Sequence, residues 1–262
     1  MSAVVQRWRD RRSLLRPAGE VIDPRAFEVA EISDDTTPRT FVEQHHYSGS
    51  YPAARFRYGL YERDELVGVA VFSHPSNPLA LRPLPTGLES TELGRFVLLD
   101  RVKGNGETWF LARAFELLRR EGLAGVVSFS DPVPRTTTDG RLVLRGHVGT
   151  IYQAFNGVYL GRARSDTLRL LPDARTLHNR ALAKLRGRER GWRYVVARLV
   201  AYGAPAPAND LDAWIEEWVP RLTRKVRHPG NHKYVWAFDR RLRKRLPASK
   251  PYPKVVDQAR AA

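Results

Sequence analysis

The sequence predicts a mixed α/β (α+β) domain, in which helices flank a central sheet, followed by a basic C-terminal extension. Three observations lead to this prediction. A strand, a glycine-containing loop, a helix and a second strand follow one another over residues 92–130. Alternating apolar side chains over residues 56–71 are typical of a β-hairpin. Residues 173–262 hold 21 Lys and Arg against 8 Asp and Glu, whereas residues 1–172 hold 23 against 20.

Length and composition exclude several classes of protein. The chain has 262 residues, 42% of them hydrophobic, which is enough for one large domain or a domain with an extension. It has no cysteine, which excludes disulfides, cysteine zinc sites, iron–sulfur clusters and thiol catalysis. No apolar run nears the roughly 18 residues of a membrane helix, and the first twenty residues carry five arginines and no apolar signal segment. We therefore expect a cytoplasmic protein without a membrane partner.

We divide the chain into a basic N-terminal arm over residues 1–24, a core over residues 25–172 and the extension over residues 173–262. The arm is expected to be poorly ordered on its own. In the core, a short strand at residues 27–31 precedes a helix that begins at Thr37-Pro38, with Thr37 as N-cap and Pro38 at the first helical position. This helix runs toward Tyr47 and ends at Ser48-Gly49.

Next come the hairpin strands, at residues 56–60 and 66–71, joined by the charged turn at residues 62–65. Four prolines between residues 74 and 90 exclude regular structure there. A strand at residues 92–100 then leads into the loop that begins at Arg101. The helix after this loop is marked by apolar side chains at i, i+3, i+4 and i+7, namely Leu111, Ala114, Phe115 and Leu118. Gly122 ends the helix, and residues 126–130 form a second buried strand.

The loop between strand and helix suits a phosphate. Glycines let the backbone approach a ligand, and the free N–H groups of a helix N-terminus attract an anion. The spacing Arg101-x-x-Gly104-x-Gly106 fits neither the dinucleotide fingerprint nor the P-loop. It resembles instead the loop by which acetyltransferases of the GNAT superfamily hold the pyrophosphate of acetyl-CoA, although an ordinary tight turn is the alternative.

This resemblance implies acetyl-CoA, or another acyl or aminoacyl donor, as cofactor. The residues that it places in the cofactor site are Phe96, Val97, Leu98, Arg101, Gly104, Asn105, Gly106, Glu107 and Thr108. Residues 151–161 are similar to the short helix and strand that close a GNAT core. In that superfamily a tyrosine here often protonates the departing thiolate, which implies this role for Tyr152. A half-buried structural phenol is the alternative.

More specifically, the chain resembles the Mom family of phage DNA-modification proteins. The resemblance is carried, in order, by His46-Tyr47, residues 93–98, residues 107–113, residues 128–131 and residues 146–154. It covers roughly residues 40–171, with a weaker echo near His232-Lys233-Tyr234. It implies a GNAT-like fold and conversion of adenine in double-stranded DNA to an N6-carbamoylmethyl-type derivative, which protects phage DNA from restriction. Residues 132–145 look like an insertion.

Adenine chemistry gives the candidate catalytic residues their roles. The N6 amine is a poor nucleophile, so it needs a base or charge stabilisation beside it, and the adenine must leave the duplex. Tyr47 would stack on the base or form a hydrogen bond with it, and His46 would move a proton. The alternative for His46 is a structural role, in which it interacts favourably with the dipole at the end of its helix. Asp131, at the end of a core strand, would act as general base or orient the amine. The alternative is that Asp131 only forms the turn that ends the strand. Either Ser128 or Ser130, but not both, would face the site; which of them does so stays open, and Ser128 is included among the candidate residues.

No metal is expected. A set of two histidines and a carboxylate is available among His45, His46, Asp131 and His147, but nothing in the spacing requires it. His228 and His232 are four residues apart, but the Pro-Gly between them forbids one helical face. We interpret this segment as a hairpin tip that touches phosphate.

In the extension, Asn209 is expected to cap an amphipathic helix, and residues 223–238 to form a hairpin around Pro229-Gly230-Asn231. A basic run at residues 240–245 would grip double-stranded DNA, or a carrier RNA, while the core acts on an extruded base. The residues expected to bind nucleic acid are Arg224, Lys225, Arg227, His232, Lys233, Arg240, Arg241, Arg243, Lys244 and Arg245. A basic tail that serves solubility alone is the alternative.

Two other functions stay open. One is a GNAT N-acetyltransferase that acts on a protein, a small amine or an aminated nucleobase. The other is a nucleic-acid-binding protein on a GNAT scaffold, without turnover. With DNA adenine as the acceptor, no small-molecule acceptor is expected.

Overall fold

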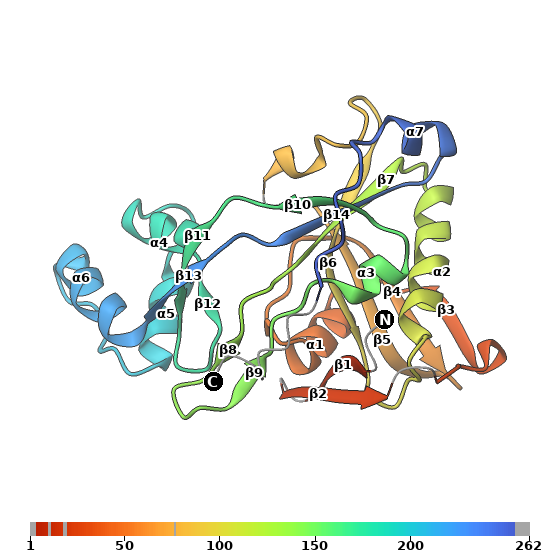
Figure 1. Cartoon of the computed structure of the whole chain (residues 1–262). Coiled ribbons are helices and arrows are strands. Elements are labelled where there is room, and N and C mark those ends of the chain that lie inside the picture. The colour runs from red at the N-terminus through yellow and green to blue at the C-terminus, as the bar shows by residue number, and fades with distance from the viewer. Residues whose placement is uncertain (1–3, 10–11, 18–19, 76, 255–262) are drawn as a thin grey trace.

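The computed structural model describes residues 4–9, 12–17, 20–75 and 77–254, and its centre is a mixed seven-stranded sheet (Figure 1). Across the sheet the strands are, in order, β10 (Val158–Arg162), β14 (His232–Ala237), β7 (Gly125–Ser130), β6 (Ser90–Leu98), β5 (Glu65–Ser73), β4 (Ala54–Glu62) and β3 (Phe27–Glu31). Only β6 and β7 run parallel. Helices cover both faces, so the predicted mixed sheet with flanking helices is confirmed.

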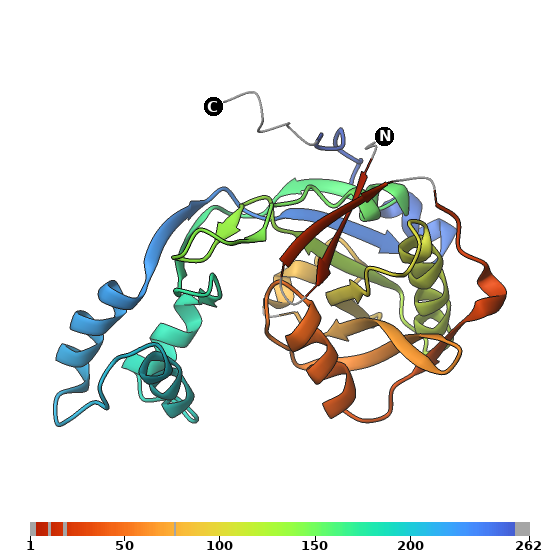
Figure 2. The same cartoon turned by 90° about the horizontal axis from the view of Figure 1, so that it is seen from below.

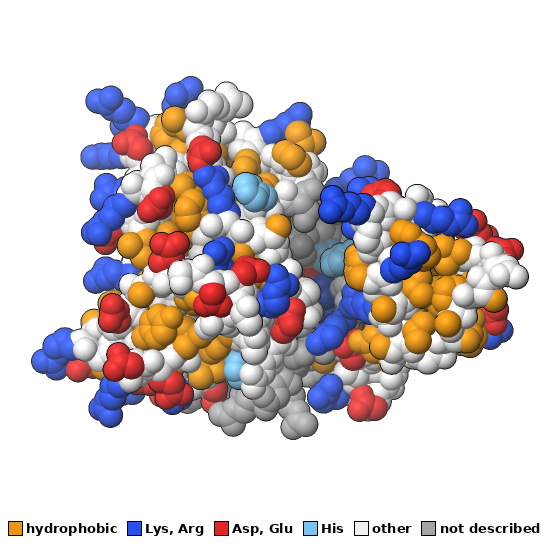
Figure 3. All heavy atoms as spheres, turned by 180° about the vertical axis from the view of Figure 1, so that it is seen from behind, with side chains coloured by type: hydrophobic (Ala, Val, Ile, Leu, Met, Phe, Trp, Pro, Cys, Tyr) orange, Lys and Arg blue, Asp and Glu red, His pale blue; other side chains and the backbone are white. Residues whose placement is uncertain are grey.

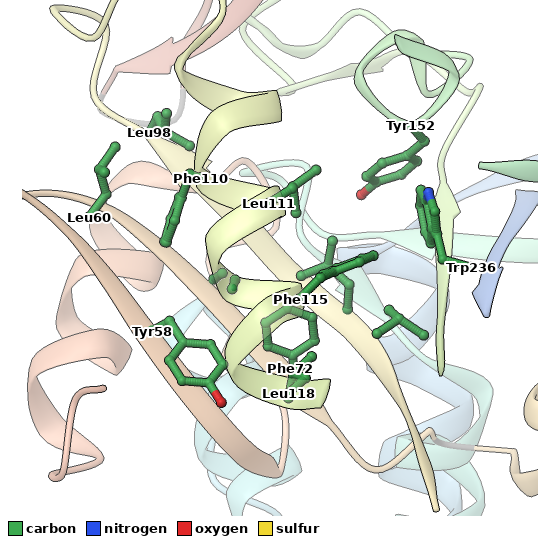
Figure 4. Packing of buried hydrophobic residues seen from close by; sticks show 14 of the residues in the cluster. Tyr58, Leu60, Phe72, Leu98, Phe110, Leu111, Phe115, Leu118, Tyr152 and Trp236 are labelled. Carbon is green, nitrogen blue, oxygen red and sulfur yellow. The ribbon is translucent and has the colours of Figure 1, made fainter. Parts of the chain in front are cut away.

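Helix α2 (Gly106–Arg120) joins β6 to β7 and buries the predicted apolar stripe against one face of the sheet. Phe115 meets Phe72 of β5 edge to face, with ring centroids 6.0 Å apart (Figure 4). Helix α1 (Thr36–His45) packs Phe41 and Val42 on the other face, against Val69 and Val71. The alternation along β5 therefore supplies both layers of the core.

Two predicted features of the core are refined by the structure. The turn between β4 and β5 holds Arg63 and Asp64 at φ 48° and 68°, the left-handed pair that a two-residue hairpin turn needs. Helix α1 begins at Thr36 with Asp35 as N-cap, so the prediction of Thr37 as N-cap is wrong. The carboxylate of Asp34 accepts the N–H of Thr37 at 2.7 Å and thus provides the first-turn acceptor.

Residues 166–228 form a second, smaller lobe. Its sheet has the order β12-β11-β13, made of β12 (Thr176–Leu177), β11 (Asp166–Leu170) and β13 (Arg224–His228). Its helices are α4 (Asn179–Arg186), α5 (Arg193–Ala201) and α6 (Leu211–Leu222), which share a separate apolar core. Figure 2 shows this lobe standing beside the main sheet and joined to it by two chain segments.

The predicted border at residue 172 does not follow the fold. Strand β14, from the extension, lies inside the central sheet between β10 and β7, whereas β11, from the predicted core, belongs to the small lobe. The predicted hairpin over residues 223–238 is wrong for the same reason. Strand β13 pairs with β11, and β14 pairs with β7 and β10.

Pro229-Gly230-Asn231 is a crossing between the lobes rather than a turn. Ala163 donates its N–H to the carbonyl of Asn231 at 2.8 Å, so the outgoing and returning segments lie side by side. Gly230 has φ 94°, and a Cβ there would stand 1.9 Å from the carbonyl oxygen of Ala163. Only glycine permits this close approach.

The remaining elements lie at the ends of the chain and in the connections. Within the predicted arm, β1 (Val4–Arg9) and β2 (Arg12–Pro17) form a hairpin, with β1 against β6 and β2 against β9 (Leu142–Leu144), while residues 1–3, 10–11 and 18–19 lie outside the described part. Strand β9 pairs with β8 (Arg135–Thr136). The others are the 3-10 turns η1 (Pro24–Ala26) and η2 (Pro78–Leu81), α3 (Thr150–Ala154) and α7 (Arg240–Arg245).

The N-cap of α6 is Asp210, one residue after the predicted Asn209, because its carboxylate accepts the N–H groups of Asp212 and Ala213, each at 3.0 Å. No helix in the described part of the chain has the length and apolar character needed to cross a bilayer.

Candidate active site

The candidate site lies where the two parallel strands stop pairing. Strand β6 pairs with β7 from Ser90 to Leu93, then bulges and continues to Leu98 beside β5 alone. Strand β7 ends at Ser130, and Asp131 follows at once. Ligands of open sheets commonly sit at this carboxyl end of parallel strands.

Asp131 is the centre of a buried ion cluster. Its side chain accepts three hydrogen bonds: from Nε2 of His228 at 2.9 Å, from the N–H of Val133 at 2.9 Å, and from Nη2 of Arg135. His228 in turn accepts the N–H of Gly230 on Nδ1 at 3.0 Å, which places its proton on Nε2. Asp131 and His228 are each 5% exposed.

The electrostatics of Asp131 favour one of its two predicted roles. Burial by itself would raise the pKa of this carboxyl, but the hydrogen bond from His228 and the charge of Arg135 outweigh burial and hold it below its usual range. An ionised carboxylate that already accepts three donors is a weak base. The geometry therefore favours an orienting role over general base catalysis.

Arg135 connects the two lobes at this point. Besides Asp131, its Nη1 binds Oγ1 of Thr176 in β12 at 2.9 Å, and its guanidinium carbon lies 5.9 Å from the ring centroid of Tyr47. Arg135 is not among the site residues predicted from the sequence, because it belongs to the segment interpreted as an insertion. Its spacing of four residues from Asp131 is a weak signal, because the segment is not helical.

Tyr47 and His46 stand at the end of α1. Their rings pack at a tilt of 33° with centroids 4.3 Å apart, and Tyr47 meets His147 edge to face at 6.3 Å. Burial, helped by the charge of Asp131, raises the pKa of Tyr47 to about 12, so its phenol is neutral. His46 is buried, and its Nδ1 accepts the N–H of Ser48 at 3.1 Å. The structure thus ties His46 into the turn that ends the helix.

Ser128 and Tyr152 form a second polar group on the sheet. Ser128 is fully buried and donates from Oγ to the carbonyl of Leu93 at 3.1 Å, while Tyr152 hydrogen bonds to Ser128. Burial raises the pKa of Tyr152, whose ring packs between Tyr234 and Trp236.

The expectation that only one of Ser128 and Ser130 faces the site is wrong. Residues two apart along a strand point to the same face. A Cβ on Gly149, just before α3, would stand 3.0 Å from Oγ of Ser130 and 2.9 Å from the ring of Tyr152. Both serines therefore lie beneath α3.

Arg95 lies between the two polar groups. Its Nε donates to the carbonyl of Ser50 at 2.8 Å and its Nη2 to Oγ of Ser50 at 2.9 Å. Its charge acts on both Tyr47 and Tyr152. Of the predicted catalytic residues, the structure thus brings Tyr47 and Asp131 together at Arg135, with His46 against the ring of Tyr47. Ser128 and Tyr152 form the second polar group.

The predicted phosphate loop at the start of α2 does not fit a pyrophosphate. Gly106 is buried, and a Cβ on it would stand 2.5 Å from Cγ1 of Val102, so it faces the protein rather than a ligand. The side chain of Asn105 accepts the N–H of Ile22 at 2.8 Å. Arg101 pairs with Glu65 at 2.7 Å and Glu62 at 3.5 Å.

The other residues of that predicted cofactor site also make contacts within the protein. Glu107 is buried in the first turn of α2, where its carboxylate adds a negative charge that would oppose a phosphate. Val97 and Leu98 are core residues, Phe96 packs on Phe110 and Thr108 bonds to the carbonyl of Asn105. Gly104 is half-buried. We therefore assign no donor step to this loop.

The predicted nucleic-acid-binding residues fall into three groups. Arg224, Lys225 and Arg227 are exposed on β13. The basic side chains of α7, residues 240–245, are also exposed. His232 is buried and hydrogen bonds through Nδ1 to the hydroxyl of Tyr159 at 2.7 Å, so the prediction that it touches phosphate at a hairpin tip is wrong. Lys233 is half-buried beside Phe129.

The two exposed groups lie in different places. Strand β14 pairs His232 with Ser130 and Ala237 with Gly125, so α7 follows the end of the strand that is away from Asp131. Five strand residues span about 17 Å. Arg224, in contrast, donates to the carbonyl of Thr136, next to Arg135, at 3.2 Å.

Seen from behind, the molecule is hollowed between the two lobes, with Lys and Arg side chains on both walls (Figure 3). Within the described residues, no three His, Asp or Glu side chains are gathered as metal ligands. The charge and shape of this inter-lobe cleft suit a polyanion.

Comparison with known proteins gives one match to a family. The model of the Mom protein family matches residues 26–254, which takes in the small lobe as well as the central sheet. No curated protein matches the chain.

Two solved structures are distantly similar. A tandem GNAT protein from the clavulanic acid biosynthesis pathway is 14% identical, with a TM-score of 0.36, over 56% of this chain and 48% of that chain. A ribosomal-protein-S5-alanine acetyltransferase from Vibrio fischeri is 13% identical, with a TM-score of 0.35, over 53% of this chain and 83% of that chain. The chain thus spans about half the length (48%) of the first of these proteins.

Proposed function

We propose that this chain, which belongs to the Mom protein family, is a transferase that modifies adenine in DNA. It attaches a two-carbon, acetyl- or glycyl-derived unit to the N6 amine. The product is a carbamoylmethyl-type base that restriction enzymes do not cut. Its amide nitrogen is supplied by a glycyl-derived unit, whereas an acetyl unit alone would give only N6-acetyladenine. The acceptor is double-stranded DNA from which one adenine is extruded.

The observation that carries this proposal is the cluster of Asp131, Arg135 and Tyr47 at the carboxyl end of β7, where Arg135 also binds Thr176 of the small lobe. A neutral tyrosine ring, backed by the ring of His46, is a surface on which a purine can stack. The Arg135 guanidinium is held in place by Asp131 and Thr176. Positioned donors of this kind stabilise negative charge, such as the charge on the acceptor oxygen of the incoming unit or on the ring nitrogens of an adenine that has lost its N6 proton.

Each side chain then has a role. Tyr47 stacks on the extruded adenine, Asp131 orients Arg135 toward it, and Ser128 with Tyr152 borders the path of the incoming unit. The donor, acetyl-CoA or an aminoacyl carrier, stays a prediction from the family resemblance. The exposed Arg224, Lys225 and Arg227 beside the cleft bind DNA phosphates, with α7 as a more distant contact.

The test is nucleoside mass spectrometry on DNA from bacteria that express the chain. The unchanged chain is expected to give a modified deoxyadenosine, and Asp131→Asn to lose it. Asp139→Asn is the matched control, because Asp139 has the same chemistry in the same segment but is exposed. DNA that is unmodified in all samples, although the protein is folded and abundant, would contradict the proposal.

A further inference from the structure

Two arginine side chains bind Thr176, where the small lobe meets the core. Arg135, from β8, binds Oγ1 of Thr176 at 2.9 Å, and Arg198, from α5, binds its carbonyl oxygen at 3.3 Å. Two guanidinium groups from different lobes are therefore held by a single residue. His178, two residues further along the chain, is the N-cap of α4 and is exposed.

Arg95, in β6, adds a third guanidinium. It is held by Ser50, close to Tyr47, while Arg135 lies over the ring of Tyr47. Arg95 and Arg135 act on each other electrostatically, and Arg135, Arg198 and Arg95 all act on His178. The four side chains thus lie near one another, where the small lobe meets the core.

These charges are compensated in part by the protein, since Glu92 acts on Arg95 and Asp173 acts on Arg198. Arg135 is paired with Asp131, but in the described part of the chain neither Arg95 nor Arg198 forms an ion pair, and both donate to carbonyl oxygens. Burial lowers the pKa of Arg95 and of Arg198. Gathering like charges in this way costs free energy, which a bound anion would offset.

We infer that Arg95, Arg135, His178 and Arg198 form a phosphate site between the lobes, which holds a backbone phosphodiester of the DNA next to the extruded adenine. This inference rests on the proposed function, since Arg135 also contacts Tyr47, against which the base would lie. A planar guanidinium suits a phosphate because it presents several donors in one fork. The site fixes which nucleotide enters, because phosphate contacts set register and orientation.

The test measures duplex DNA affinity as a function of salt for the full-length chain. Each phosphate contact contributes about 0.9 to the slope of log affinity against log salt. Arg198→Gln is expected to lower the magnitude of that slope by about this amount and to weaken binding about tenfold. Arg198→Lys, which keeps the charge, should keep the slope. Arg119→Gln removes the same charge from the exposed last turn of α2 and should change neither quantity.

A second variant guards against loss of folding. His178 is exposed, so His178→Glu should fold normally, as judged by circular dichroism, while its carboxylate repels DNA from the site. Binding by His178→Glu is expected to fall at least tenfold. If this variant and a folded Arg198→Gln bind DNA with the slope of the unchanged chain, the inference is wrong. The absence of salt-dependent DNA binding in the unchanged chain would overturn it as well.

The source of the phosphate is resolved by repeating the titration with bulk transfer RNA. A fall in slope for transfer RNA but not for duplex DNA would overturn the assignment to DNA. Failure of the proposed function is a separate result, because it is measured by nucleoside analysis. It corresponds to DNA that binds the chain with the expected salt slopes and yet contains no modified deoxyadenosine.

Discussion

Arg135 is the single residue that connects the parts of the candidate site, since it contacts Asp131, Thr176 and Tyr47. Arg135→Met would leave the carboxylate of Asp131 buried with His228 but without its guanidinium partner. Loss of one member of a buried ion pair commonly costs about 3–5 kcal/mol. Urea unfolding should show a loss of this size, whereas Arg141→Met, in the same segment but exposed, should change stability little. Equal stability of the two variants would contradict the assigned contacts.

His147 provides a pH-dependent test at the same scale. Burial lowers its pKa from 6.5 to about 4 in the folded chain, so the folded state binds its proton less readily than the unfolded state. Its contribution to stability is complete above pH 6.5 and is lost as the pH falls toward 4. That contribution is at most ~3 kcal/mol.

His147→Gln cannot titrate, so its unfolding free energy should fall less between pH 6.5 and 4 than that of the unchanged chain. Urea midpoints measured at several pH values across this window will give the difference. Parallel curves for the two proteins would show that His147 is not buried as described.

The start of α6 gives a test at the scale of elements. Asp210, not Asn209, accepts the N–H groups of Asp212 and Ala213. Asp210→Ala should therefore lower stability by about 1 kcal/mol, the usual value of an N-cap, and Asn209→Ala by much less. Thermal unfolding of the two variants measures this, and the reverse order would restore the cap predicted from the sequence.

Elements with local signals could be predicted from the sequence. The stripe from Leu111 to Leu118 needs only helical spacing, and the turn at Arg63-Asp64 needs only the strands beside it. The partners of β13 and β14 could not be predicted in this way. Pro229-Gly230-Asn231 has the composition of a turn, but in the fold it links two strands that pair with different sheets.

The candidate site likewise contains residues that could be predicted from local sequence patterns and contacts that could not. Tyr47, Asp131, Ser128 and Tyr152 follow recognisable strand and helix ends, so they could be named from the sequence. Asp131 and His228, however, are 97 residues apart and meet only because the small lobe is inserted between β10 and β14. A spacing of this length leaves no local pattern in one sequence. The glycine loop fails for the opposite reason, because its local pattern is right but Gly106 faces Val102.

The insertion of one lobe into the other makes a prediction for the whole molecule. Ending the chain at residue 172 removes β14 from the middle of the sheet, and this fragment should not fold. Replacing residues 164–230 with a short Gly-Ser linker should leave a folded central sheet, because Ala163 and Asn231 are already hydrogen bonded at 2.8 Å. Circular dichroism and cooperative urea unfolding of both proteins measure this. A folded 1–172 fragment would support the original border.

The central claim is that an adenine taken out of DNA is held against Tyr47 and modified there. The most direct measurement is the amount of modified deoxyadenosine in DNA from cells that express the unchanged chain, Tyr47→Phe or Tyr47→Ala at equal protein levels. We expect the phenylalanine variant to retain most of the modification, since it keeps the ring, and the alanine variant to lose it. Equal modification by a folded Tyr47→Ala protein, or none by the unchanged chain, would contradict the account.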